Sequence, residues 1–294
     1  MKCLISGING VVGKILAQIL KDQYNWDVYG IGKGMCNQIK YFQVDLASER
    51  SAMLFSKKID LQFDIFLHCA AKIDLNAEKS DLISNNIIGT INAAKIGMSI
   101  GVGRFINISS IPVIGKIINT PISEDHPCNP INFYHFTKLY AEKILKNYNL
   151  LNSNFKVVTL RIPSPVGRGM PQRSIFPILV HRSLSNFDLE ITGNRRAKQS
   201  YLDIRDLAQA IVKAAHKNNI ADLYNIGPIS AFNRIDLATY IIKQTNSRSR
   251  IIDLTFESEG YSENWSIESL KAEQDFNYKP IYSLGDTISW VAQE

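Results

Sequence analysis

The stretch that decides the fold reads KCLISGINGVVG and spans residues 2–13. Its first five residues form a strand-like run, and apolar residues then recur at spacings of three and four, which predicts a helix. Gly7, Gly10 and Gly13 lie between and within these two elements. In this context the first glycine allows a tight turn, the second lets the backbone approach a pyrophosphate, and the third allows close helix–sheet packing. The amino terminus of the helix supplies unpaired N–H groups that favour an anion.

Strand-like and helical segments alternate through the first half of the chain. The strand-like runs are short and nearly continuous, which is typical of parallel strands buried on both faces. This alternation predicts an α/β fold with a Rossmann-type, doubly wound parallel sheet. Further strands are expected at residues 27–31, 41–44, 63–69, 104–108 and 156–160, and further helices at 83–99 and 134–148.

In the second half of the chain, prolines interrupt the regular pattern of strands and helices. Prolines at positions 163, 165, 171 and 177 predict a loop-rich substrate region. The expected division is an NAD(P)-binding Rossmann domain, residues 1–162 plus 203–228, and a smaller substrate-binding lobe, residues 163–202 and 229–294. Helices are expected at 206–217, 234–244, 267–276 and 283–291, and a strand at 221–226.

The charge balance indicates the kind of ligand. The 294 residues carry 33 Lys and Arg against 27 Asp and Glu, a formal net charge of +6. This excess suits an anionic small molecule such as a nucleotide diphosphate. Nucleic acid is not expected as a partner, because the basic residues are scattered rather than gathered in a block.

The sequence also predicts several absences. No apolar run approaches the ~18 residues of a membrane span, and the first strand begins at residue 2, so we expect no membrane anchor, no signal peptide and a cytoplasmic location. The cysteines are too far apart for a zinc site or a redox pair, so no metal is expected. There are four of them: Cys3, Cys36, Cys69 and Cys128.

Lys33 bears on the choice of cofactor. An acidic residue that holds the ribose 2′-hydroxyl is expected about 20 residues beyond such a glycine turn. That position falls on Gly32 and Lys33. A lysine there can pair with a 2′-phosphate, which favours NADP over NAD. The alternative is an exposed lysine on a flexible loop.

A tyrosine and a lysine four residues apart open one predicted helix, in the stretch YHFTK at 134–138. Tyr134 and Lys138 share a helix face. A phenol titrates near ~10 in water, and a nearby cation is expected to lower that pKa, so that the tyrosine can exchange a proton with a substrate oxygen. Ser110, at the end of a predicted strand, can orient that oxygen. Alone, the pattern is common on helix surfaces; after a glycine turn it is far more specific.

Together these features resemble one family, the extended short-chain dehydrogenases/reductases, also called NAD-dependent sugar-nucleotide epimerase/dehydratases. The resemblance covers nearly the whole chain. Its markers are the glycine turn, VDL at 44–46, HCAA at 68–71, NIIGT at 86–90, FINISS at 105–110, YHFTK at 134–138, LR at 160–161 and YNIG at 224–227.

The resemblance implies roles for individual residues. Asp45 and Leu46 would flank the adenine, Ala70 and Ala71 would line the cofactor cleft, and Pro163 and Ser164 would lie near the nicotinamide. The implied catalytic set is Ser110, Tyr134 and Lys138. It also implies a homodimer through the helices at 83–99 and 134–148. The residues expected to hold the cofactor are Gly7, Asn9, Gly10, Val11, Val12, Lys33, Asp45, Leu46, Ala70, Ala71, Asn86, Tyr134, Lys138 and Pro163.

Departures from the family pattern narrow the function. Dehydratases carry an Asp-Glu pair after the active-site hydroxyl residue, whereas this chain has Ile111 and Pro112, so dehydration is not expected. Gln199 stands where many members have a phosphate-binding arginine; a neighbour such as Arg196 can substitute. Arg168 and Arg173 are further candidates for a substrate phosphate. The residues expected to hold the substrate are Ser110, Ser164, Arg168, Arg196 and Gln199.

Three functions stay open on the sequence. The first is sugar-nucleotide 4-epimerisation, favoured because the sequence after Arg161 resembles that of epimerases. The second is an NADPH-dependent reduction of a 4-keto sugar nucleotide or similar carbonyl, favoured by Lys33. The third is a non-catalytic module that senses nucleotides or binds RNA, which has no chemical need for Ser110, Tyr134 and Lys138 together.

Overall fold

The computed structural model describes residues 1–34, 39–74, 76–152, 154–172, 174–257 and 264–293. The chain divides into two compact units, which we call the first unit and the second unit. The first unit comprises Met1–Lys116, Pro127–Ile162 and Ala210–Tyr224, and the second comprises Ile117–His126, Pro163–Gln209 and Asn225–Glu294.

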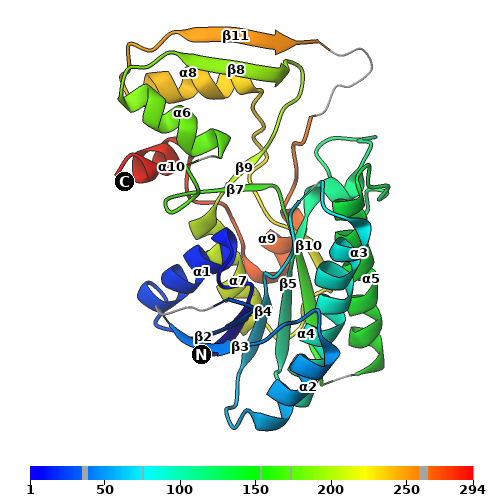
Figure 1. Cartoon of the computed structure of the whole chain (residues 1–294). Helices are drawn as coiled ribbons and strands as arrows, with labels where there is room; N and C mark the ends of the chain where they lie inside the picture. Colours follow the sequence, from blue (N-terminus) through cyan, green and yellow to red (C-terminus); the bar gives the residue numbers. More distant parts are fainter. Residues whose placement is uncertain (35–38, 75, 153, 173, 258–263, 294) are drawn as a thin grey trace. The chain divides into compact units, whose positions relative to one another are not determined.

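A seven-stranded sheet forms the centre of the first unit, in the order β3-β2-β1-β4-β5-β6-β10 (Figure 1). The pairs from β3 to β6 are parallel. This is the order of a Rossmann fold, and it confirms the predicted fold class. The strands are β1 (Lys2–Ser6), β2 (Asp27–Gly32), β3 (Lys40–Gln43), β4 (Ile65–His68), β5 (Arg104–Ser110), β6 (Lys156–Ile162) and β10 (Leu223–Asn225).

The strand order reverses between β1 and β4, because the chain runs outward from β1 to β3 on one side and from β4 to β6 on the other. Ligands of open α/β sheets bind beyond the carboxyl ends of the strands at such a switch point. The glycine turn follows β1, and Ala70 and Ala71 follow β4. Both predicted cofactor segments therefore lie at the switch point.

The helices of the first unit follow the predicted pattern with two differences. The helix expected at 83–99 begins earlier, at Lys79, and its middle part is π-helical. A helix at Glu49–Lys58 was not predicted, because only Ala52 and Phe55 are buried on it. The helices are α1 (Val11–Asp22), α2 (Glu49–Lys58), α3 (Lys79–Leu82), η1 (Ile83–Ile88), α4 (Gly89–Ser99), the short η2 (Ile111–Ile114), α5 (Phe133–Leu151) and α7 (Ile204–His216), which continues into this unit from the second.

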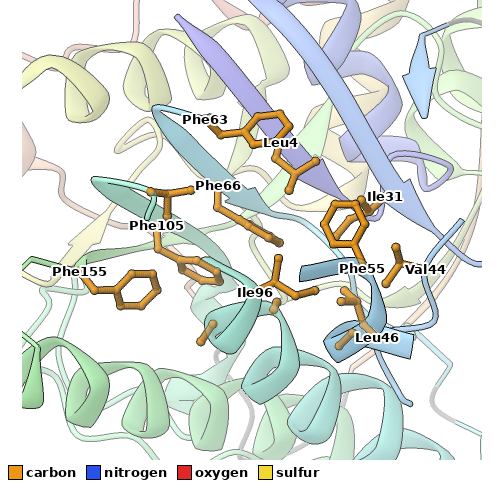
Figure 2. Close-up of a cluster of buried hydrophobic side chains, with 14 of the residues drawn as sticks. Leu4, Ile31, Val44, Leu46, Phe55, Phe63, Phe66, Ile96, Phe105 and Phe155 are labelled. Carbon is orange, nitrogen blue, oxygen red and sulfur yellow. The ribbon is translucent and has the colours of Figure 1, made fainter. Parts of the chain in front are cut away.

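Aromatic rings fill the core between the sheet and its helices (Figure 2). Phe105 on β5 stacks on Phe66 of β4 at 5.0 Å between ring centroids and lies 5.5 Å from Phe155. Gly97 lets α4 come close: a Cβ there would lie 3.0 Å from Phe155 and 3.3 Å from Phe105. Burying such a ring contributes about 1.5–3 kcal/mol. This packing fixes β4 and β5, whose carboxyl ends carry candidate site residues.

The second unit contains two small parallel sheets, β7–β9 and β8–β11. The expectation of a loop-rich segment after residue 162 is wrong in part. Pro165 lies in β7, and Pro177 lies in the first turn of α6, where no backbone donor is needed. The elements are β7 (Ser164–Val166), α6 (Ile175–Leu184), β8 (Leu189–Asn194), β9 (Tyr201–Asp203), α8 (Arg234–Gln244), β11 (Ile251–Phe256), α9 (Leu270–Phe276) and α10 (Leu284–Val291).

Three segments, residues 117–126, 203–209 and 225–228, group differently from the expected division. Residues 117–126 belong to the second unit, where Ile122 N donates to Ser266 O at 2.8 Å and Asn225 N donates to Glu124 Oε1 at 2.8 Å. These partners lie more than 100 residues away in the chain, so no local pattern indicates the grouping. Residues 203–209 and 225–228 also belong to the second unit.

Candidate active site

The glycine turn has the conformation that its spacing predicts. Gly7 has a φ of +72°, which side chains other than glycine rarely adopt. Gly10 N donates to Gly7 O at 2.9 Å, and Gly10 is the N-cap of α1. A Cβ on Gly13 would clash with the Gly7 carbonyl oxygen. Helix α1 therefore begins directly on the turn, with Val11 and Val12 in its first turn.

The backbone at the end of β4 lies close to this turn. A Cβ on Gly7 would lie 2.6 Å from Ala70 N and Cα, and Cys69 N donates to Ser6 O at 3.1 Å. Ala70 and Ala71 are half-buried. The close approach of two backbones beside a helix amino terminus is the cradle that a dinucleotide pyrophosphate requires. The residues present fit that group.

Lys33 is paired within the first unit. Its Nζ lies 3.2 Å from Asp45 Oδ1 and donates to Asn85 Oδ1 at 3.0 Å. The two charged side chains are 56% and 43% exposed, so solvent screens the pair. Leu46, next to Asp45, is buried. The structure therefore brings Lys33 to the residue that the family resemblance assigns to the adenine.

Asn9, in the glycine turn, is exposed, and its Nδ2 donates to Tyr41 Oη at 3.4 Å. A Cβ on Gly34 would lie 3.2 Å from this Nδ2 atom. Gly32 and Gly34 thus leave room for the Asn9 amide.

Asn86 lies in η1 and is 2% exposed. Its Oδ1 accepts from Lys72 N at 2.7 Å, and its Nδ2 donates to Lys72 O at 3.2 Å and to Thr137 Oγ1 at 3.0 Å. The amide therefore joins the segment after β4 to α5, one residue before Lys138. These bonds give Asn86 a structural role beside the cofactor segments; direct cofactor contact stays a prediction.

Tyr134 and Lys138 occupy the first two turns of α5. The helix begins there because the side chain of its N-cap, Asn132, accepts from His135 N at 2.9 Å. Tyr134 is 8% and Lys138 6% exposed. Lys138 Nζ donates to Ile108 O on β5 at 2.5 Å, two residues before Ser110. The lysine thus ties α5 to the end of β5.

The electrostatics of this pair correct one expectation. Burial raises the pKa of Tyr134 to about 12, whereas we expected Lys138 to lower it. The reason is that the phenol is buried, which disfavours its charged form. Burial also lowers the pKa of Lys138 to about 8, against the opposing effect of Glu142. The Tyr134 phenol is therefore neutral near neutral pH, and Lys138 loses its proton more readily than an exposed lysine does.

Two histidines near the pair are neutral. His68 is a buried strand residue, as expected, and contacts Ser6 Oγ at 2.7 Å and Thr90 Oγ1 at 3.0 Å. Burial lowers its pKa to about 3 and that of His135 to about 4. Neither imidazole carries a charge near neutral pH.

The predicted substrate residues of the second unit separate into groups. Gln199 Nε2 donates to Ser164 Oγ, so these two lie together. Arg196 pairs with Glu257 at 2.7 Å. Arg168 is exposed after β7. Buried Pro163 packs by Gly227, where a Cβ would lie 3.0 Å from its Cγ. Arg173, like Cys36, lies outside the described residues.

Two kinds of feature are absent from the described part of the chain. Within it, no group of three or more His, Cys, Asp or Glu side chains is placed to hold a metal ion. None of the helices in the described ranges is both long and apolar enough to span a bilayer.

Comparison with known proteins decides the family. Residues 3–227 match the NAD dependent epimerase/dehydratase family. The chain belongs to this family. The resemblance predicted from the motifs is thereby confirmed, and with it the prediction that the protein is an enzyme of this kind.

Individual members of the epimerase/dehydratase family are distant in sequence. The dTDP-glucose 4,6-dehydratase of Actinoplanes sp. is 21% identical, over 77% of this chain and 73% of its own. UDP-glucose 4-epimerase 2 of Arabidopsis thaliana is 25% identical, over 83% of this chain and 75% of its own. The solved UDP-glucose 4-epimerase of Thermotoga maritima, with UDP-glucose, has a TM-score of 0.87 at 18% identity and covers 100% of this chain and 98% of its own. At that identity the structural likeness shows the fold.

The positions where the family resemblance implies the Asp-Glu pair of a dehydratase are apolar here. Ile111 and Pro112 open η2, and Ile111 is 1% exposed. A buried isoleucine offers no carboxyl group for an elimination.

Sequence reasoning missed a buried group next to the pair. Glu142 lies one turn after Lys138 on α5 and binds both Ser109 and Arg161. The i to i+4 spacing from Lys138 is the signal that could have found it, whereas Arg161 is recognisable in the sequence only as a family marker.

Proposed function

We propose that this protein is an NAD(P)-dependent sugar-nucleotide epimerase that acts at a sugar carbinol, in the manner of a 4-epimerase. The observation that carries the proposal is the burial of Tyr134 and Lys138 at the end of β5. They share a unit with the glycine turn. Ile111 and Pro112 argue against the dehydratase activity named for the Actinoplanes relative.

The proposed chemistry divides between cofactor and protein. A bound nicotinamide would supply the hydride chemistry at the carbinol carbon, and the protein would supply the proton transfer and hold the substrate. Tyr134 takes the hydroxyl proton in the first half and gives it back in the second, so protons and electrons balance. Ser110 donates a hydrogen bond to the substrate oxygen. The first half starts from the tyrosinate, which burial disfavours, so the positive charges of Lys138 and of the oxidised nicotinamide would have to lower the pKa of Tyr134 once the cofactor is bound.

Residues of the first unit would hold the dinucleotide. Gly7, Gly10 and the first turn of α1 would bind the pyrophosphate, and Asp45 and Leu46 would flank the adenine. Ser164 and Gln199 are proposed for the substrate, because Gln199 already donates to Ser164 and both side chains carry amide or hydroxyl groups that suit a sugar.

The contacts of Lys33 bear on the choice between the epimerase and the reductase. A reductase draws NADPH from the cellular pool, and Lys33 would then bind the 2′-phosphate. Its pairing with Asp45 and Asn85 occupies the ammonium, which supports an epimerase that retains NAD. The NADPH-dependent reductase remains the second candidate, since the exposed ion pair between Lys33 and Asp45 contributes little stability and Lys33 can bind a 2′-phosphate in its place.

A homodimer is part of the proposal. On η1 and α5, four large apolar side chains are exposed by 37–47%: Ile83, Ile88, Phe136 and Tyr140. Phe136 and Tyr140, both on α5, stack at 6.1 Å between centroids, and α5 contacts η1. An apolar patch of this kind suits an interface between two copies of the chain.

The nucleotide released on denaturation tests the function. We expect mass spectrometry of the denatured, purified protein to find NAD(H), and the intact protein to interconvert UDP-glucose and UDP-galactose or another epimeric pair. Tyr134→Phe should retain the nucleotide and lose turnover. An empty protein that prefers NADPH over NADH would favour the reductase. A biological activity unaffected by Tyr134→Phe would support the non-catalytic module.

A further inference from the structure

Four side chains of the first unit are linked by hydrogen bonds next to α5, the helix that carries Tyr134 and Lys138. We call them the buried cluster: Ser109, Cys128, Glu142 and Arg161. Arg161 Nη2 donates to Glu142 Oε2 at 2.7 Å, and its Nε reaches Oε1 and Oε2 at 3.1 and 3.2 Å. Ser109 Oγ donates to Glu142 Oε1 at 2.5 Å. Arg161 Nη2 also reaches Cys128 Sγ at 3.2 Å. The Arg161 and Glu142 side chains are 4% and 8% exposed.

Two members of the buried cluster, Glu142 and Ser109, lie on elements that carry candidate site residues. Glu142 is one helical turn beyond Lys138 on α5. Ser109 directly precedes Ser110 on β5, and Arg161 lies beside it, since Ser109 and Arg161 are register partners of β5 and β6. The buried cluster therefore links the strand that carries one candidate residue to the helix that carries the other two.

The energetics indicate a role in geometry. Removing two charges from water is costly, and a buried ion pair often gives no more net stability than apolar residues of the same volume. Its hydrogen bonds are, however, short and directional, and a guanidinium fork fixes the carboxylate in one orientation. A pair at this depth thus constrains position more than it stabilises the fold.

We propose that Glu142 and Arg161 are positioning residues that hold Lys138 on α5 in register with Ser110 on β5. The proposal rests on the proposed function, because it assumes that Lys138 and Ser110 act on a bound cofactor and substrate. Neither Glu142 nor Arg161 touches a reacting atom. They act through the backbone of α5, β5 and β6.

Glu142 also sets the charge around Lys138. The titratable groups that act on or face the ammonium are Glu142 and His135 on α5 and His68 and Cys69 at the end of β4. The pKa values of His68, about 3, and His135, about 4, leave both neutral, and burial raises that of Cys69 to about 12. Glu142 is therefore the charged member of this set, and it raises the pKa of Lys138 against burial.

A double substitution separates positioning from stability. Either single change, Glu142→Gln or Arg161→Met, leaves an unpaired buried charge and destabilises the fold. Together they remove both charges, and we expect the urea midpoint to return close to that of the parent. NADH and NADPH binding, followed by nicotinamide fluorescence, should nevertheless weaken about tenfold, because a displaced Lys138 loses a charge-assisted hydrogen bond.

The pH dependence of binding is a second readout. In the parent, cofactor affinity should fall as Lys138 loses its proton, and in the double variant this fall should occur at lower pH, because Glu142 no longer supports the ammonium. Turnover by the double variant should fall about 10- to 100-fold, the cost of a small misplacement of a reacting group. A merely structural ion pair would let affinity and turnover recover together with stability, which would overturn the proposal.

Two further variants keep the test decisive. Arg104→Met removes another buried arginine from the opposite end of β5, where its Nη2 donates to Lys217 O at 2.5 Å. It should lower stability and leave cofactor affinity unchanged. If the double variant does not fold, Ser109→Ala removes one bond without leaving a charge and should weaken binding in the same direction; unchanged binding would overturn the proposal. A parent chain that binds neither cofactor would overturn both proposals, whereas equal binding by parent and double variant would overturn only this one.

Discussion

The Lys138 ammonium donates a 2.5 Å hydrogen bond to the backbone carbonyl of Ile108, inside a site where the lysine is 6% exposed. The bond directs the charge toward β5, and burial lowers the pKa of the lysine to about 8. A lysine so placed destabilises the folded chain while it is protonated. This has a measurable consequence.

We expect Lys138→Met to change how stability depends on pH. The pKa of Lys138 is about 8 in the folded chain and 10.5 for an unperturbed lysine, so above pH 8 the unfolded chain binds the extra proton and stability rises with pH. From pH 7 to 9.5 the rise is about 2 kcal/mol. The variant should lack it and be more stable at pH 7. Urea unfolding at both pH values measures this, and a rise that persists in the variant would contradict it.

The close approach of Gly7 to Ala70 predicts a second outcome. Gly7→Ala should lower stability by about 1–3 kcal/mol and abolish NAD(H) binding, because the new methyl group meets the Ala70 backbone. Gly101→Ala is the matched control: Gly101 has a φ of +70° with nothing within 4 Å of a built Cβ. It carries the same backbone strain without the clash. Equal losses in the two variants would show that the approach to Ala70 is unimportant.

Lys33→Gln should separate the two cofactors. If Lys33 binds a 2′-phosphate, NADPH affinity falls about tenfold and NADH affinity does not change. Unchanged affinities for both would support retained NAD and the pairing with Asp45. Lys40→Gln is the control, since Lys40 also forms an exposed 3.2 Å ion pair, with Asp27. Both variants should keep their stability within about 0.5 kcal/mol.

The proposed dimer depends on the exposed face of η1 and α5. Phe136→Lys should shift the sedimentation coefficient from dimer to monomer, because a charge cannot be buried there unpaired. Phe187→Lys is the control, because Phe187 is 61% exposed in the second unit. A monomeric parent, or a Phe136→Lys variant that sediments as a dimer, would contradict the proposed interface.

For Asp206, in the second unit, we predict a dependence of stability on pH that is opposite in sign to that of Lys138. Burial raises its pKa to about 6, while it accepts from Ile281 N at 2.9 Å and Tyr282 N at 3.2 Å. Between pH 3.8 and 6 the folded chain binds the extra proton, so stability should fall as pH rises, by at most about 3 kcal/mol. Asp206→Asn should remove this fall. Unfolding midpoints at pH 4.5 and 7 measure it, and the parent should lose more than the variant.

The sequence predicted the first unit well because its signals are local. Buried parallel strands are short apolar runs, and the glycine spacing follows from a single turn. The second unit was predicted less well: α8 begins and ends as expected, but β8 and β11 pair across some 60 residues, and β11 is largely exposed. No local pattern specifies such a pairing.

For the site, residue types were predictable and their environments were not. The spacing of Tyr134 and Lys138 was sufficient to nominate them. The predicted direction of the Tyr134 pKa shift was wrong, because the pKa is raised by burial of the phenol, which the spacing of the two residues does not reveal. The partners of Lys33 and Glu142 come from other elements, so no helical or strand period could indicate them.

The π-helical turn η1 separates two phases along one continuous helix, residues 79–99. Asn86 projects toward Lys72 and Thr137, while Ile96, on the α-helical side, packs into the aromatic core (Figure 2). Deleting one residue between 83 and 88 would remove the extra residue that the wide turn accommodates, and the residues on both sides would keep their faces. The same deletion within α4 would rotate the two sides of the gap by about 100° relative to one another. Single-residue deletions should therefore be tolerated in η1 far more readily than in α4.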